Sequence, residues 1–164
     1  MGIRTIGLEK TLLQLNGEIA RVNNLARAGL IRGGLLILRE SNKIAPRDTS
    51  NMAASGFVTW AGKPESQPNF KLKTGTSSSF DTQEQKLKTG HVEALAQAKI
   101  DIHKHELIYG PAVEVGYSAY YTLYVHEDLT AKHKAGKEAK FLQRAIDRNM
   151  NGLIPAIKSG GKAI

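Results

Sequence analysis

The stretch PAVEVGYSAYYTLYVHE, residues Pro111–Glu127, contains two different hydrophobic periods next to each other. Val113, Val115 and Tyr117 alternate with other residues, which is the period of a β-strand. The tyrosines then recur at the spacing of one helix face: Tyr117, Tyr120, Tyr121 and Tyr124. Gly116 stands at the change of period, where a residue without a Cβ turns the backbone most easily. We therefore predict a strand that runs into a helical turn whose tyrosine face packs on the rest of the chain.

The N-terminal part of the chain, from about Thr5 to Asn42, has the pattern of an amphipathic helix. Its apolar stripe advances by alternating steps of four and three residues: Leu8, Leu12, Leu15, Ile19, Val22 and Ala26. Glycines follow at Gly29, Gly33 and Gly34, and each costs a helix roughly 1 kcal/mol relative to alanine. This pattern predicts two consecutive helices, or one long helix with a kink near residues 28–34. The stripe is long for one small domain, so part of it is expected to pack on a neighbouring subunit. The alternative is that all of it faces the chain's own core.

The middle of the chain alternates between ordered and polar segments. Pro46 disfavours the helical conformation at Ala45 and so ends the first helix. A short turn over residues 51–55 and a β-branched, aromatic strand over 57–61 follow. Residues 62–90 are mostly polar and predict a projecting arm or loop that orders on a partner. A helix is predicted over about 91–105.

The C-terminal segment from Gly136 to about Ser159 has the cleanest amphipathic stripe, and Pro155 predicts a kink or an end near Asn151. Together the segments predict one domain over residues 1–164, with its core in approximately 5–61 and 91–158. The expected fold class is α+β: a long N-terminal helix and a C-terminal helix packed on a small, mostly antiparallel sheet, with a long polar loop or arm.

Composition limits the classes of function. The 164 residues are 41% apolar and include no cysteine, which excludes disulfides and cysteine metal sites. No apolar run approaches the roughly 18–20 residues that span a bilayer, so we expect a soluble, unexported protein without a membrane partner. The formal charge of +8 permits contact with nucleic acid or with acidic protein surfaces but does not demand it.

Motifs for catalysis or metal binding are missing from the sequence. His103 and His105 are two residues apart, and no histidine pair has the i, i+4 spacing with an intervening acid of helical zinc sites. We therefore expect surface or capping histidines. There is no Gly-x-Ser-x-Gly motif and no cysteine nucleophile. The sequence predicts a protein that is not an enzyme and has no cofactor or metal.

Four cations share a second face of the predicted C-terminal helix: Lys137, Lys140, Arg144 and Arg148. They could contact DNA phosphates in a channel. The alternatives that we favour are a solvated helix face or a salt-bridged contact between subunits.

Three segments, in this order, resemble the small neck proteins of long-tailed bacteriophages, the head–tail connector or tail-completion proteins. They are APRDTS at residues 45–50 with Ser55 after it, VEVGYSAYYTLYVHE at 113–127, and AKFLQRA at 139–145. Members of the family tend to show Ala-Pro-x-Asp-Thr-Gly, a Val-Gly strand leading to Tyr-x-x-Tyr-Val-(His/Glu)-Glu, and Lys-Phe-Leu opening the last helix. Ser50 stands where the family usually has glycine, and residues 62–108 lie outside the resemblance.

The resemblance implies a structural virion protein that forms a homo-oligomeric ring, six- or twelve-fold, at the head–tail junction. Its neighbours would be portal-side and tail-tube-side proteins, and the subunits would reside in the host cytoplasm during assembly. The residues that carry the match would define the fold or an interface: Pro46, Asp48, Thr49, Gly116, Tyr117, Tyr120, Tyr121, Tyr124, His126, Glu127, Lys140, Phe141 and Leu142. We expect Asp48 and Thr49 to fix the helix-to-strand turn. Tyr121 and Tyr124 are expected to dock against Phe141 and Leu142.

Two other functions stay open at this point. A tail-tube terminator, which caps the tube, differs little in sequence from a connector. A basic nucleic-acid-binding protein of the host cytoplasm would also explain the net charge, although no helix-turn-helix or zinc pattern is present.

Overall fold

The computed structural model describes residues 8–46, 51–60, 63–64 and 78–160. These residues form five helices and three short strands. In chain order they are α1 (Leu8–Ile44), α2 (Asn51–Ala54), β1 (Gly56–Trp60), β2 (Lys63–Pro64), α3 (Ser78–Tyr109), β3 (Glu114–Tyr117), α4 (Thr122–Glu127) and α5 (Phe141–Gly160).

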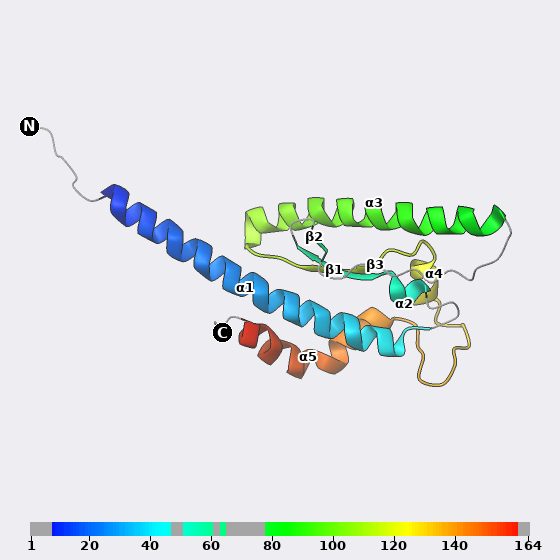
Figure 1. The fold of residues 1–164 in the computed structure, drawn as a ribbon. Coiled ribbons are helices and arrows are strands. Elements are labelled where there is room, and N and C mark those ends of the chain that lie inside the picture. The colour runs from blue at the N-terminus through cyan, green and yellow to red at the C-terminus, as the bar shows by residue number, and fades with distance from the viewer. Residues whose placement is uncertain (1–7, 47–50, 61–62, 65–77, 161–164) are drawn as a thin grey trace, which may run out of the picture.

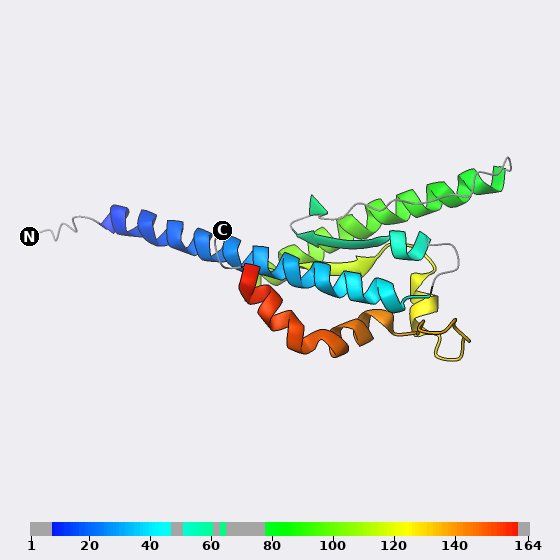
Figure 2. The ribbon, with the colours of Figure 1, turned by 60° about the horizontal axis from the view of Figure 1, so that its bottom comes forward.

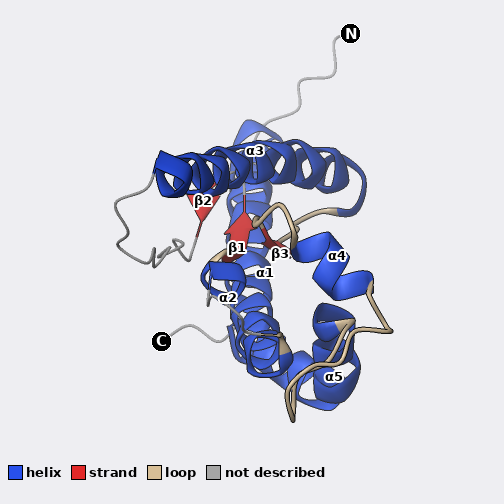
Figure 3. Ribbon diagram, turned by 90° about the vertical axis from the view of Figure 1, so that its right-hand side faces the viewer, coloured by secondary structure: helices blue, strands red, loops and turns tan. Residues whose placement is uncertain are grey.

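The elements stack in layers around a small antiparallel sheet of order β2-β1-β3. α3 covers one face of the sheet and α1 covers the other, while α5 lies against α1 on the side away from the sheet (Figures 1 and 3). The predicted α+β fold class is confirmed.

The central strand β1 is buried because it faces a helix on each side. Val58 is fully buried toward α1, where its Cγ1 lies 3.0 Å from the position of a Cβ added to Gly34. Phe57 points the other way, and its ring lies edge-on to that of His91 on α3, with 5.9 Å between the centroids. Neighbouring side chains of a strand alternate between the two faces, so these two contacts fix the strand's orientation.

α1 is one unbroken helix, so the predicted break or kink near residues 28–34 is wrong. The glycines instead provide room for close packing. A Cβ at Gly29 would lie 2.2 Å from the carbonyl oxygen of Ile157, and one at Gly33 would lie 2.8 Å from the Ile157 side chain. These two glycines of α1 therefore lie where α5 approaches the α1 backbone. The packing between the two helices offsets the low helix propensity of glycine.

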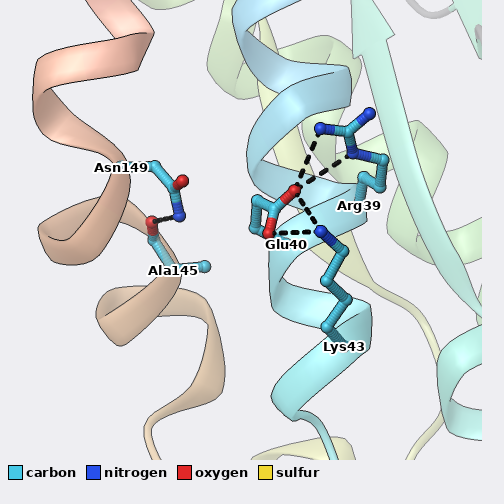
Figure 4. A network of polar contacts seen from close by, with 5 residues as sticks. All are labelled: Arg39, Glu40, Lys43, Ala145 and Asn149. Carbon is cyan, nitrogen blue, oxygen red and sulfur yellow. Dashed lines mark hydrogen bonds and ion pairs between the residues drawn. The ribbon is translucent and has the colours of Figure 1, made fainter.

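The polar side chains beside the α1–α5 contact form hydrogen bonds within their own helix. Glu40 on α1 accepts hydrogen bonds from Arg39 (3.1 Å) and from Lys43 (2.8 Å), as Figure 4 shows. The ammonium of Lys43 holds the pKa of the Glu40 carboxyl below its ordinary value. On α5, the side-chain amide of Asn149 donates to the carbonyl of Ala145 (2.9 Å; Figure 4). These polar groups therefore have partners outside the apolar contact between the two helices.

α3 is twice as long as the predicted helix over 91–105, and it includes residues 78–90 of the predicted polar arm. Leu87 is buried, and α3 passes the backbone of Ser118 at Gly90, where an added Cβ would be in ordinary contact with the Ser118 carbonyl oxygen at 3.4 Å. Residues 78–90 are thus the first part of a helix that crosses the sheet and extends past its edge (Figure 2). Residues 65–77 of the predicted arm lie outside the described part of the chain.

α5 begins at Phe141 rather than near Gly136, and it continues through Pro155 instead of ending near Asn151. Lys140 precedes it with a positive φ of 54°, which sets the direction in which the helix starts. Pro155 and Asn151 are both exposed, so water can bind the carbonyl that the proline leaves without an N–H partner. The axis of α5 is bent in Figure 2.

We predict opposite effects for two alanine substitutions at helical glycines. Gly29→Ala should lower the free energy of unfolding by about 1–3 kcal/mol, because the new methyl group overlaps the backbone of α5. Gly152→Ala is the matched control, since nothing lies within 4 Å of the added Cβ, and it should raise stability by up to about 1 kcal/mol. Urea unfolding followed by circular dichroism measures both. Equal effects of the two substitutions would contradict the close α1–α5 approach.

Candidate interaction surface

Four segments of the chain meet in one apolar cluster, which we call the Phe141 corner. Phe141 is 0% exposed, and Ala45 and Met52 are buried with it. Further apolar side chains pack around these three: Ile44, Tyr117, Tyr121, Val125 and Leu142. The corner therefore joins the end of α1, the short α2, the tyrosine stretch and the start of α5.

Aromatic contacts and a hydroxyl network position the tyrosine stretch at this corner. Tyr117 and His126 both meet Phe141 edge-on, with ring centroids 5.2 and 4.8 Å away. The hydroxyl of Tyr117 donates to Asn42 Oδ1 (2.9 Å) and lies 2.8 Å from Ser41 Oγ. These bonds tie strand β3 to the last turns of α1.

Backbone bonds then hold the loop before α5 on the same corner. The N–H of Lys140 donates to the carbonyl of His126 (2.7 Å), and that of Glu138 donates to the carbonyl of Ile44 (2.9 Å). Lys140 also pairs with Glu127, which lies 2.8 Å from His126 Nδ1. The ammonium of Lys140, and then His126, hold the pKa of the Glu127 carboxyl below its ordinary value. His126, Glu127 and Lys140 thus form one linked polar group at the rim of the corner.

The tyrosines divide into an inner and an outer pair. Tyr117 and Tyr121 pack into the Phe141 corner, whereas Tyr120 and Tyr124 are 58% and 77% exposed. The predicted docking of Tyr124 against Phe141 is wrong because α4 begins only at Thr122, with Tyr121 as its N-cap. Val125 takes the inward position instead.

Gly116 has a different role from the predicted turn. It lies inside β3 opposite Phe57, without a positive φ, and a Cβ there would approach the Phe57 ring to 3.0 Å. The residue is small because an aromatic ring covers it. Asp48 and Thr49, which are expected to fix a turn, lie outside the described part of the chain. Pro46 directly follows the buried Ala45.

The four basic residues of the predicted cationic face have acceptors within the chain. Arg144 and Arg148 both pair with Glu138, whose pKa is lowered first by Arg144 and then by Arg148. The Nζ of Lys137 donates to the carbonyl of Lys43 (2.6 Å), and Lys140 pairs with Glu127. Carboxylates therefore offset much of this positive charge.

A buried histidine, which the sequence does not single out, connects α3 to the tyrosine stretch. His91 is only 8% exposed, so the expectation of a surface or capping residue is wrong at this position. Its Nδ1 lies 2.8 Å from Ser118 Oγ, and that hydroxyl donates to the carbonyl of Ser55 (3.2 Å). Burial lowers the pKa of His91. The only sequence signal for this contact is that Leu87 and His91 are four residues apart on one helix face.

Two open pockets flank the sheet. One, of about 210 Å³, lies between α1, β3 and α5 and has apolar walls that include Ile37, Val115 and Ile146. The other, of about 450 Å³, lies between α1, α3 and β3 and contains Asp101 and Glu114. Burial, and then the charge of Asp101, raise the pKa of the Glu114 carboxyl. Among the described residues, no group of three or more His, Cys, Asp or Glu side chains is placed to hold a metal ion.

A row of uncovered apolar side chains lies on the N-terminal part of α1. Arg27 marks the point where the helix leaves the other layers: it pairs with Glu106 of α3 (2.9 Å) and lies over the ring of Trp60. Every residue from Leu8 to Asn24 is exposed. Figures 1 and 2 show this part of α1 projecting away from the layers. We call Leu8–Ala26 the α1 extension.

A second, smaller exposed apolar patch lies beside the Phe141 corner. Its members come from α4 and the residues on either side of it: Tyr120, Leu123, Tyr124 and Leu129. Clustered exposed apolar side chains mark interaction sites more often than single ones do. We therefore take the extension and this patch as candidate interaction surfaces.

Searches against protein-family models, curated proteins and solved structures find no match for this chain. In the described part of the chain, no helix combines the length and the apolar character needed to cross a bilayer.

We predict that His91 makes stability fall in mildly acidic solution. Because burial lowers its pKa, the unfolded chain binds a proton more readily than the folded chain. The contribution of His91 to the free energy of unfolding is fully present at pH values above the ordinary histidine pKa of about 6.5. This contribution is lost as the pH falls below that value. Each unit by which the pKa is lowered corresponds to about 1.4 kcal/mol at full protonation.

The measurement is urea unfolding between about pH 7.5 and pH 5. His91→Gln, which does not titrate, should reduce the loss of stability on acidification, and the same change at the exposed His103 should leave it as in the unsubstituted protein. Identical pH profiles for His91→Gln and the unsubstituted protein would show that the histidine is not held neutral by the fold.

Proposed function

We propose that this chain is a structural subunit of the neck of a long-tailed bacteriophage, where copies assemble into a ring that joins head to tail. The observation that carries the proposal is the Phe141 corner. Each of the three segments that resemble the phage neck family supplies residues to it: Ala45 from the first, Tyr117 and Tyr121 from the second, and Phe141 from the third. Segments with a shared role in the fold are expected to be brought together in this way.

The exposed surfaces support self-assembly. The α1 extension presents several large apolar side chains, and Tyr120, Leu123 and Tyr124 present more beside the Phe141 corner. Interface cores are rich in aromatic and aliphatic side chains and poor in charge. In a ring, the two surfaces could serve different contacts, one between subunits and one with a portal-side or tail-tube-side protein. The proposed role is structural and requires no catalytic residue or cofactor.

The internal ion pairs favour this role over nucleic-acid binding as the main function. Arg144 and Arg148 would have to leave Glu138 before pairing with phosphates, which reduces the gain from each contact. The net charge of +8 is still compatible with weak contact to DNA that passes through a ring.

The test is a cryo-electron-microscopy map of the native particle, inspected at the head–tail junction. We expect a ring of helix-rich subunits whose density accommodates α1, α3 and α5 in the layers described above. A junction fully accounted for by other chains would reject the neck assignment.

Deleting the chain separates the two neck roles. Unjoined heads beside tails of normal length are the expected result for a connector or completion protein. Tails of abnormal length would instead identify a tail-tube terminator. Joined, infectious particles would exclude both roles.

A further inference from the structure

The apolar stripe of the α1 extension has the heptad spacing of a coiled coil. Its alternating steps of four and three residues place three side chains at one core position of the heptad and three at the other. We call this stripe the extension seam. Its members are Leu8, Leu15 and Val22 at the d positions and Leu12, Ile19 and Ala26 at the a positions.

The extension seam continues a helix contact that already exists within the chain. The next two positions of the same heptad are Gly29 and Gly33, which lie against Ile157 and Leu153 of α5. α5 runs antiparallel to α1 and ends at Gly160, close to Arg32, whose guanidinium donates to the Ser159 carbonyl (3.1 Å). The C-terminal part of this α1 stripe thus packs against a helix, α5. Within the described residues, the part of the stripe on the extension has no helical partner.

A partner on the extension would stabilise this part of the helix. Most helical stability in proteins comes from burying an apolar face. The exposed large side chains Leu12, Leu15 and Ile19 leave that face in solvent.

The charge distribution favours a second copy of this chain as the partner. The extension has two acidic and two basic residues, Glu9, Glu18, Lys10 and Arg21, so its net charge is zero, while the whole chain has +8. Two extensions can therefore meet without the repulsion that would oppose contact between other parts of two copies. The same neutrality gives the extension little attraction for nucleic acid or for an anionic lipid surface.

We propose that the extensions of different copies pack against one another through the extension seam as a parallel coiled coil. The parallel direction follows from cyclic symmetry, because rotation about the axis of a ring leaves all equivalent helices pointing the same way along that axis. The proposal rests on the self-assembly part of the proposed function and adds the residues and the geometry of the contact. It does not depend on the location of the ring in a phage neck.

Leu13 provides an internal control for this contact. It is 73% exposed, more than Leu12 or Leu15, but it lies at a b position, outside the seam. A partner that recognises general exposed hydrophobicity would use Leu13 at least as much as its neighbours. A coiled coil uses Leu12 and Leu15 and leaves Leu13 in solvent.

The first experiment compares the full chain with Leu15→Asn and Leu13→Asn by sedimentation equilibrium over a range of concentrations. Both substitutions replace an exposed leucine of the same helix with asparagine, so their effects on the monomer's fold are matched. We expect reversible self-association of the unsubstituted chain. Leu15→Asn should raise its dissociation constant at least about tenfold, and Leu13→Asn should change it less than about twofold.

The second experiment uses the absence of cysteine from the sequence. In a parallel coiled coil, residue 19 of one copy faces residue 19 of the next, so Ile19→Cys should form a disulfide-linked dimer under mild oxidation. Leu13→Cys should form much less at equal concentration. An antiparallel arrangement would pair different residues and leave Ile19→Cys mostly reduced.

The outcomes separate this inference from the proposed function. A chain that stays monomeric at about 0.1 mM, or one whose association is weakened equally by Leu15→Asn and Leu13→Asn, overturns the extension seam as the contact between copies. Failure of Ile19→Cys to cross-link overturns the parallel geometry. The head–tail junction map tests the neck role independently of all three results.

Discussion

The burial of one aromatic ring holds the two halves of this chain together. Phe141 is the first residue of α5, yet its ring lies among residues from the end of α1 and from the tyrosine stretch. Full burial of such a side chain stabilises a fold by roughly 1.5–3 kcal/mol relative to leaving it exposed. Its larger effect is geometric, because the ring fixes where α5 begins. From that point α5 runs back along α1, and its apolar stripe meets the glycines of α1.

The overall class of the fold could be predicted from local patterns, but the contacts at its glycines could not. Helical periodicity locates α1 and α5, β-branched and aromatic composition locates β1, and alternation locates β3. From the sequence, Gly29, Gly33 and Gly116 are expected to be places where the backbone bends, since glycine's conformational freedom is its local property. In the structure all three are places where another element comes close, and that use depends on Ile157 and Phe57, which lie far away in the sequence.

The candidate interaction surfaces also combine features that can be predicted from the sequence with features that only the structure reveals. The sequence revealed the α1 stripe and its regular spacing, which left open whether a partner or the chain's own core covers it. Within the described residues, the structure places the end of α5 beside Arg32. The tyrosines were assigned to one helical face by spacing alone, and the late start of α4 moved Tyr124 to the surface. The acidic partners of the basic face come from Glu127 and Glu138, whose proximity to those cations is a tertiary property.

The continuity of α1 has a mechanical consequence. The extension and the part of α1 that packs on the sheet and α5 are one helix without proline, so there is no hinge between them. Its length of about 56 Å, at 1.5 Å per residue, makes it a lever. A small rotation of the layers about Arg27 therefore displaces Leu8 sideways, and the displacement grows in proportion to the distance between the two residues. The tilt of each body and the position of its helix tip therefore cannot vary independently.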